Sequence, residues 1–482
     1  MQISIKKLHR TIIFLSIVFM PITALNVPVF SSIFRGLSEE AAFYPLFFGI
    51  FLWLGEKIII RQPIHIPKNV CFKLFLSFLV WVLLSGFLNA FDIYSNSFRG
   101  VSGGMRFVTL FIGFIFFSAV LLYLFDNLQN DKKWLLENFE RAIFFSFTLA
   151  GTYSVFEILR YVGVPISYEV LAVFDGFFRS APSVNPFEMR LHSICMEPSF
   201  FGFFASIMFP WIFGGMFLKR HRLWFLFGCL YLIVLLVLTF SRSLLVIILV
   251  EFFFMLYLYR FEIQFQKKFF TYFLSVLIIG VLVGIEVVGI AGFRELITWA
   301  EGDVLQIFFS LFKLEDESVI ARYGSQMAAI NMFLEHPFTG VGLGQYAFGV
   351  NEFMPSWAYE SEEISNTAFG FVNGVWPICH GLYARLLGET GAPGLMLWIS
   401  VWGGLCYKLI RSCSIVDRAE GLRIKNFFVS TLGFLFFGVM HDSFGMIVVW
   451  ILMGTGMVLI EWDQEEGNKD GDAYRVGNSG KL

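Results

Sequence analysis

Long apolar runs separated by short polar connections dominate the chain. A helix that crosses a membrane needs about 20 mostly apolar residues. The pattern predicts twelve such helices, at about 11–30, 41–56, 72–90, 105–125, 142–162, 199–218, 223–240, 244–259, 269–292, 381–404, 426–440 and 445–461. Runs of this length lack the alternation of barrel strands. We therefore expect an all-α, polytopic membrane helical bundle with residues 1–462 as a single membrane-embedded unit.

Composition agrees with this fold and excludes several classes of protein. Apolar residues make up 57% of the chain and charged residues only 15%, so a soluble multidomain enzyme is excluded. The net charge of -2 and the absence of a basic stripe argue against a nucleic-acid partner. The six cysteines have no paired spacing typical of zinc sites or disulfide frameworks. Whether Cys195 and Cys379 pair stays open.

The basic residues predict the orientation of the chain. If the N-terminus is cytoplasmic, the inner loops and tails hold most of the basic residues, including every lysine except Lys313. Both termini are then cytoplasmic, and residues 463–482, which are polar and rich in glycine, are predicted to be a disordered cytoplasmic tail. The basic residues that remain outside are nearly all arginines, whose planar forks suit phosphate and carboxylate groups.

Two long loops are predicted on the outer side, at about 163–198 and 293–380. The second contains an expected amphipathic helix at 321–335 with apolar residues at positions 327, 330, 333 and 334, and Pro337 ends it. Such a helix can lie on the membrane surface. The aromatic residues of this loop either anchor the protein at the interface or stack on sugars.

Two outer segments carry polar groups that can bind or activate a hydroxyl or a phosphate. In RLHSICMEPSFFG, Arg190 and Glu197 precede a predicted span; the alternative is an ordinary helix start, with Glu197 favoured by the helix dipole and Ser199 as the cap. In LTFSRSLL, Arg242 occupies a short turn at the membrane surface. It either binds a lipid diphosphate or reaches the bulk headgroups.

A third outer segment, HGLYARLLGETGAPGL, begins at His380. Arg385 and Glu389 follow on the same predicted helix, four residues apart, and can form an ion pair. Charged residues within membrane helices are expensive and often functional, and a purely structural pair is the alternative. The outer loops contain no cluster with metal-ligand spacing, so no metal or other cofactor is expected.

These motifs resemble the family of bacterial O-antigen polymerases and O-antigen ligases (Wzy-like). ARYGSQMAAINMFLEHPFTGVGLGQY is similar to that family's outer-loop helix followed by a His-Pro-x-x-Gly-x-Gly-x-Gly sequence. LTFSRSLL resembles its Ser-Arg turn, and HGLYARLLGETGAPGL its entry into a late helix. RLHSICMEPSFFG is similar to a segment of the polymerase members. The order of the motifs agrees over about residues 185–400.

The resemblance implies a metal-independent, inverting glycosyltransferase of the bacterial cell inner membrane that acts at the periplasmic face. Its donor would be a glycan on undecaprenyl diphosphate, and membrane lipids and a chain-length regulator protein would be its other partners. His380 would be the catalytic base. The implied roles of the other residues are diphosphate binding by Arg242 and Arg322, with Arg190 and Arg385 as second choices, and support by Glu197 and Glu389.

Three activities fit this reading. A polymerase of surface polysaccharide joins one lipid-linked repeat unit to another, and the Glu-Pro-Ser segment favours it. A ligase transfers the glycan to lipid A core or to protein. A flippase or transporter of lipid-linked sugars is a different class, but the paired broken helices that many transporters show are not apparent.

Overall fold

The computed structural model describes residues 2–25, 27, 35–178, 190–218, 222–264, 271, 275, 317–369, 376–413, 416–442 and 444–461. Within this part the chain is almost entirely helical. The N-terminal half contains α1 (Gln2–Val18), η1 (Arg35–Glu39), α3 (Phe43–Ile60), α4 (Val70–Leu88), α5 (Ala90–Ser95), β1 (Ser97–Phe98), β2 (Val101–Ser102), α6 (Gly103–Leu128), α7 (Lys132–Tyr161), α8 (Pro165–Phe178) and α9 (Pro198–Leu218). Strands β1 and β2 pair as a small antiparallel hairpin.

The C-terminal half continues this pattern. It contains α10 (Arg222–Leu238), α11 (Arg242–Leu258), α12 (Arg260–Gln264), α16 (Glu317–Glu335), α17 (Tyr346–Phe353), η2 (Ser356–Glu360), α18 (Glu362–Phe369), α19 (Leu382–Ser412) and α20 (Arg418–Met440). A last apolar helix spans Ile447–Glu461. The all-α prediction is therefore confirmed.

Seven of the described helices are long and apolar enough to cross a membrane, namely α3, α4, α6, α7, α9, α19 and α20. Three shorter apolar helices, Arg222–Leu238, Ser243–Leu258 and Ile447–Glu461, follow the same pattern. These ten correspond to ten of the twelve predicted spans, as expected for a multi-pass membrane protein. The predicted span at 11–30 is wrong in its bounds, because α1 ends at Val18. The predicted span at 269–292 and the tail at 463–482 lie outside the described residues, apart from positions 271 and 275.

Helices α9 and α20 form the centre of the bundle. Their most apolar stretches are 89% and 67% buried, whereas those of α3 and α6 are mostly open to the surroundings. Glycines allow the close approach of neighbouring helices, as is typical of membrane bundles. A Cβ at Gly214 of α9 would lie 2.3 Å from Asn426 of α20, and one at Gly433 of α20 would lie 1.9 Å from Glu251 of α11.

Helix α19 is broken near its start. Gly391 has φ 68° and ψ -175°, which only glycine adopts readily, and Pro393 follows. The loop at 337–344 covers the break. Val341 and Gly342 donate backbone hydrogen bonds to the carbonyls of Gly388 and Glu389, each at 2.9 Å. The carbonyl groups released by the break therefore keep partners, as buried polar groups require.

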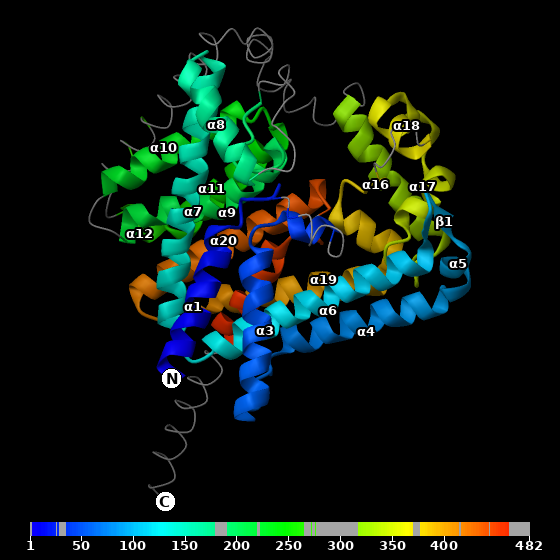
Figure 1. Cartoon of the computed structure of the whole chain (residues 1–482), viewed down its shortest axis with the longest axis horizontal. Coiled ribbons are helices and arrows are strands. Elements are labelled where there is room, and N and C mark those ends of the chain that lie inside the picture. Colours follow the sequence, from blue (N-terminus) through cyan, green and yellow to red (C-terminus); the bar gives the residue numbers. More distant parts are fainter. Residues whose placement is uncertain are drawn as a thin grey trace, which may run out of the picture.

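Helix α16 packs on the first turns of α19. A Cβ at Gly388 would lie 2.7 Å from the carbonyl oxygen of Ala329. The predicted helix at 321–335 is confirmed, and two residues of its predicted apolar face, Met327 and Leu334, are exposed. Contact of this face with the membrane surface stays a prediction. The buried face consists of small residues and one methionine, namely Ala321, Ser325, Ala328, Ala329 and Met332. Figure 1 shows α16, α17 and α18 together at one end of the molecule, beside β1 and α5.

Candidate functional site

His380 is held at this end of the bundle by α16. Its backbone N–H donates to Ser325 Oγ at 3.2 Å, and its carbonyl accepts a hydrogen bond from Gln326 Nε2 at 2.7 Å. Because both bonds use the backbone, neither occupies a nitrogen of the imidazole ring. His380 Nε2 lies 3.0 Å from Glu363 Oε1, and 17% of the histidine side chain is exposed. The site thus presents a partly accessible imidazole paired with a carboxylate.

Arg322 belongs to the same group. The hydrogen bond to His380, together with the nearby charge of Arg322, lowers the pKa of Glu363 against the opposing effect of burial. Glu363 of α18 was not predicted from the sequence. The structure therefore brings together two of the predicted residues, His380 and Arg322, and adds a carboxylate that orients the imidazole.

His441 connects this group to the core. Its ring stacks on Phe437 of α20, with centroids 4.7 Å apart, and meets the edge of Phe200 of α9 at 4.9 Å. Burial first, then the charge of His380, lowers the pKa of His441 to about 4. Since Arg322 acts on the same ring, His380, Arg322 and His441 share one neighbourhood. His441 is consequently neutral at ordinary pH, and its ring packs between Phe200 and Phe437.

We expect His441 to make the folded protein sensitive to acid. The unfolded chain binds the proton near the ordinary pKa of 6.5, the folded protein only near 4. Stability is therefore complete above about pH 6.5 and falls as the pH decreases toward 4, by about 3 kcal/mol at most. His441→Phe preserves the aromatic packing and should reduce this loss. Melting temperatures in lipid nanodiscs between pH 4.5 and 7 check it; identical pH profiles would contradict the assignment.

Arg385 and Glu389 form the predicted ion pair on α19. Arg385 Nε lies 3.2 Å from Glu389 Oε2, and the guanidinium also binds Asp442. Glu389 further accepts a hydrogen bond from the backbone N–H of Tyr346 at 3.2 Å. Asp442, which the sequence analysis missed, follows His441 in the chain. The pair therefore fixes the break of α19, the start of α17 and the turn after α20 to one another.

Arg190 lies on the turn between α10 and α11. Its Nε donates to the carbonyl of Thr239 at 3.1 Å, and Leu191 N–H donates to that of Leu238 at 2.9 Å. Arg190 is thus close to the start of α11, where Arg242 is the first residue. The side chain of Arg242 lies outside the described part of the structure. The two arginine motifs, far apart in sequence, converge at this turn.

Glu197 directly precedes α9. It is exposed, its carbonyl accepts the N–H of Phe201 at 3.2 Å, and its carboxylate accepts a hydrogen bond from Ser199 Oγ at 3.2 Å. These contacts favour the helix-start interpretation, with Glu197 rather than Ser199 at the position before the helix. Within the described residues these contacts do not extend to His380, so a supporting role for Glu197 stays a prediction.

The first turn of α9 lies between the two arginine-bearing regions. A Cβ at Gly202 would collide with Leu244 of α11, at 1.8 Å, and Phe200 contacts His441. The start of α9 therefore contacts the start of α11 on one side and His441, beside the His380 group, on the other.

Two buried features concern the loop before α9 and the question of the Cys195–Cys379 pairing. Glu157 of α7 accepts hydrogen bonds from the backbone N–H groups of His192 and Ser193, at 3.1 and 2.9 Å. It therefore holds the loop that carries Arg190. Cys195 and Cys379 are both buried, and no disulfide joins them in the described part of the chain.

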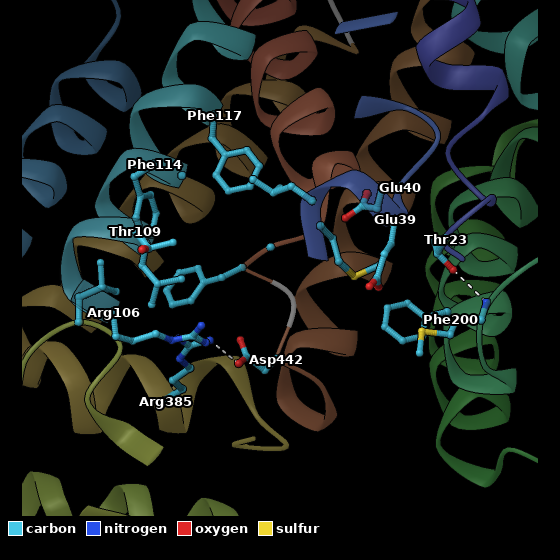
Figure 2. Close-up of a pocket in the computed structure, with 18 residues that line it drawn as sticks. Thr23, Glu39, Glu40, Arg106, Thr109, Phe114, Phe117, Phe200, Arg385 and Asp442 are labelled. Carbon is cyan, nitrogen blue, oxygen red and sulfur yellow. Dashed lines mark hydrogen bonds and ion pairs between the residues drawn. The ribbon is translucent and has the colours of Figure 1, made fainter. Parts of the chain in front are cut away.

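A pocket of about 340 Å³ opens beside the Arg385–Asp442 pair. Figure 2 shows Arg106, Arg385 and Asp442 on one side of it and Glu39 and Glu40 on the other, with Phe114, Phe117 and Phe200 among the apolar residues. Arg106 of α6 was not predicted as a site residue. A smaller cavity of about 50 Å³ shares Arg106, Arg385 and Asp442 and is lined by Trp376. The guanidinium of Arg106 lies 4.9 Å from the centre of the Trp376 ring.

Comparison with known proteins gives one match. No curated protein matches the chain. Residues 227–399 match the family model Wzy_C, described as O-antigen ligase. This stretch includes the start of α11, all of α16, and His380, Arg385 and Glu389. The protein is thus a multi-pass membrane protein, and its segment 227–399 is similar to the O-antigen ligase family, the family that its motifs resemble.

Proposed function

We propose that the protein polymerises undecaprenyl-diphosphate-linked oligosaccharide repeat units at the periplasmic face of the bacterial inner membrane, with both termini in the cytoplasm. The observation that carries the proposal is the His380–Glu363 pair, 3.0 Å apart, next to Arg322. It lies in a multi-pass membrane protein and partly within the segment that matches the O-antigen ligase family.

The reaction follows from the chemistry of these groups. The Nε2–H of His380 donates to Glu363, which leaves Nδ1 to accept the proton of an acceptor hydroxyl. The hydroxyl oxygen attacks the anomeric carbon of the donor from the face opposite the diphosphate. The bond between that carbon and the phosphate oxygen breaks, and undecaprenyl diphosphate leaves with the electron pair. One attack of this kind inverts the configuration at the anomeric carbon.

The leaving diphosphate gains negative charge, and fixed cations stabilise it. Arg322 is beside His380, and Arg242 begins α11, whose first turn contacts the start of α9 next to His441, so we assign these two arginines to the diphosphate. Arg190, near the same turn, is a second candidate for binding the diphosphate. Arg385 suits the role less, because Glu389 and Asp442 already neutralise it. In this proposal Glu389 stabilises the fold around Arg385 and does not bind sugar.

Purified protein in lipid nanodiscs tests this proposal. With a lipid-diphosphate-linked repeat as the only substrate, and without nucleotide or added metal, we expect oligomers of two or more repeats on a gel. Products that form only when lipid A core is added would instead identify a ligase, the second candidate that the family match favours. No transfer to either acceptor would contradict both and leave a flippase as the alternative. A chain-length regulator, proposed from the family resemblance alone, would change only the length distribution.

Arg242→Lys tests how the diphosphate is held. Lysine keeps the charge but loses the planar fork that binds two phosphate oxygens. We expect the transfer rate to fall by about tenfold or more, since a bond to a charged group contributes roughly 1.5–3 kcal/mol. Arg222→Lys, at the opposite end of the α10–α11 hairpin, is the matched control. An unchanged rate for Arg242→Lys would place the diphosphate elsewhere.

A further inference from the structure

The 340 Å³ pocket beside Arg385 is not used by the mechanism above. Aromatic rings, among them Phe114, Phe117 and Phe444, form much of its wall, and charged groups occupy two opposite sides. Its volume is at the lower end of the range of ligand pockets, about 300–1,000 Å³. It can therefore hold a small, partly polar group with an apolar face.

The charges of the pocket argue against an anionic ligand. Arg385 is already bound to Asp442 and Glu389. Glu39 and Glu40 face it across the pocket (Figure 2). The charge of Arg385 is therefore already balanced by its own carboxylate partners, and Glu39 faces the guanidinium of Arg106 across the space. Since no guanidinium is left in excess to bind a diphosphate or an acidic sugar, we expect a neutral occupant.

Glu40 is suited to a neutral polar ligand. It is 8% exposed, and its Oε2 accepts a hydrogen bond from the backbone N–H of Ile447 at 2.9 Å. Burial raises the pKa of Glu40 to about 8. A protonated carboxyl donates one hydrogen bond and accepts others, which matches the mixed donors and acceptors of a sugar. The C–H face of a pyranose in turn matches the aromatic wall.

The pocket also lies mostly outside the family-matching segment. Of its lining, only Leu343 and Arg385 come from residues 227–399; the rest comes from the N-terminal part, the start of α9 and the turn after α20. Phe200 of the wall touches His441, which feels the charge of His380. The pocket therefore adjoins the proposed catalytic group, while most of its lining residues lie outside the segment that matches the family.

We propose that this pocket binds one neutral sugar residue of the acceptor glycan and thereby selects which glycan is extended. The identity of the occupant as part of the acceptor rests on the proposed function. The pocket itself holds an uncharged pyranose between its phenylalanine wall and the Glu39–Glu40 wall.

Two glycines allow the pocket to be filled without a backbone collision. A Cβ at Gly445 meets nothing within 4 Å, and one at Gly113 meets only Phe117, at 4.0 Å. Gly445→Leu and Gly113→Leu therefore place side chains beside the pocket space. Gly403→Leu on α19 is the matched control, because Gly403 is exposed, has the same open surroundings and does not line the pocket.

Saturation-transfer NMR on the full-length protein, in nanodiscs free of sugar-based detergent, measures binding. The probes are the methyl glycosides of glucose, galactose, N-acetylglucosamine and N-acetylgalactosamine, with methyl glucuronide as the acidic comparison. We expect at least one neutral glycoside to receive saturation and methyl glucuronide none. The signal should be lost in both filled variants and kept in Gly403→Leu.

Absence of signal for every neutral glycoside, or equal signal in the filled variants, would overturn the proposal. The reconstitution assay separates this outcome from failure of the proposed function. Transfer without glycoside binding refutes the pocket alone. Glycoside binding that the filled variants remove, in a protein that transfers no glycan, keeps the sugar pocket and refutes the glycosyltransferase.

Discussion

His380→Ala should abolish long glycan chains while leaving the protein folded. A general base contributes about 10²–10⁴-fold to the rate, so the initial rate in nanodiscs should fall by at least the lower figure. The fold should persist, because the two hydrogen bonds that place this residue on α16 come from its backbone. Surface glycan on a gel should change from a ladder to single repeats.

His336→Ala is the matched control for this experiment. His336 lies at the end of the same helix α16, and its hydrogen bonds to Met332 and Gly340 use only the backbone. We expect the surface-glycan ladder and the melting temperature of His336→Ala to equal those of the unmodified protein. If His380→Ala still produced full-length glycan ladders, the assignment of His380 as the catalytic base would be ruled out.

Gly391→Ala should destabilise the protein more than any other single methyl group added to α19. A Cβ at this position would lie 2.2 Å from the carbonyl oxygen of Phe338, and the φ of 68° is unfavourable for alanine. Strain and overpacking together should cost roughly 3–5 kcal/mol. We expect a large drop in the yield of folded protein in membranes and in its melting temperature.

Gly403→Ala provides the comparison on the same helix. Its Cβ would meet nothing within 4 Å, and alanine favours the helix over glycine. This variant should be at least as stable as the unmodified protein. Equal melting temperatures for the two variants would show that the protein tolerates a regular helix at Gly391.

The apolar pattern predicted the fold class well, because a membrane helix must satisfy its backbone hydrogen bonds within itself. It did not predict which face of α16 packs on the bundle. Close helix contacts in this bundle use small residues, here Ala328, Ala329 and Gly388, whereas the large residues Met327 and Leu334 stay exposed. A search for small residues at helical spacing would have found the packed face.

The site was predictable only in part. His380 and Arg322 were assigned from the resemblance to the O-antigen polymerase and ligase family, and the Arg385–Glu389 pair followed from helical spacing. Glu363 and Asp442 did not, because their partners are 17 and 57 residues away in the chain. Such contacts depend on how helices pack, which the periodicity of a single helix does not encode. A charged residue at the very end of a span, as at Asp442, was the available signal.

The break at Gly391 divides α19 into two stretches with different neighbours. Arg385 and Glu389 precede it, while residues 392–407 contain no charged side chain. The first stretch packs under α16, and the loop at 337–344 supplies hydrogen bonds at the junction. The ion pair is therefore enclosed by protein, and the uncharged second stretch can lie in a membrane without carrying ionic groups into the hydrocarbon.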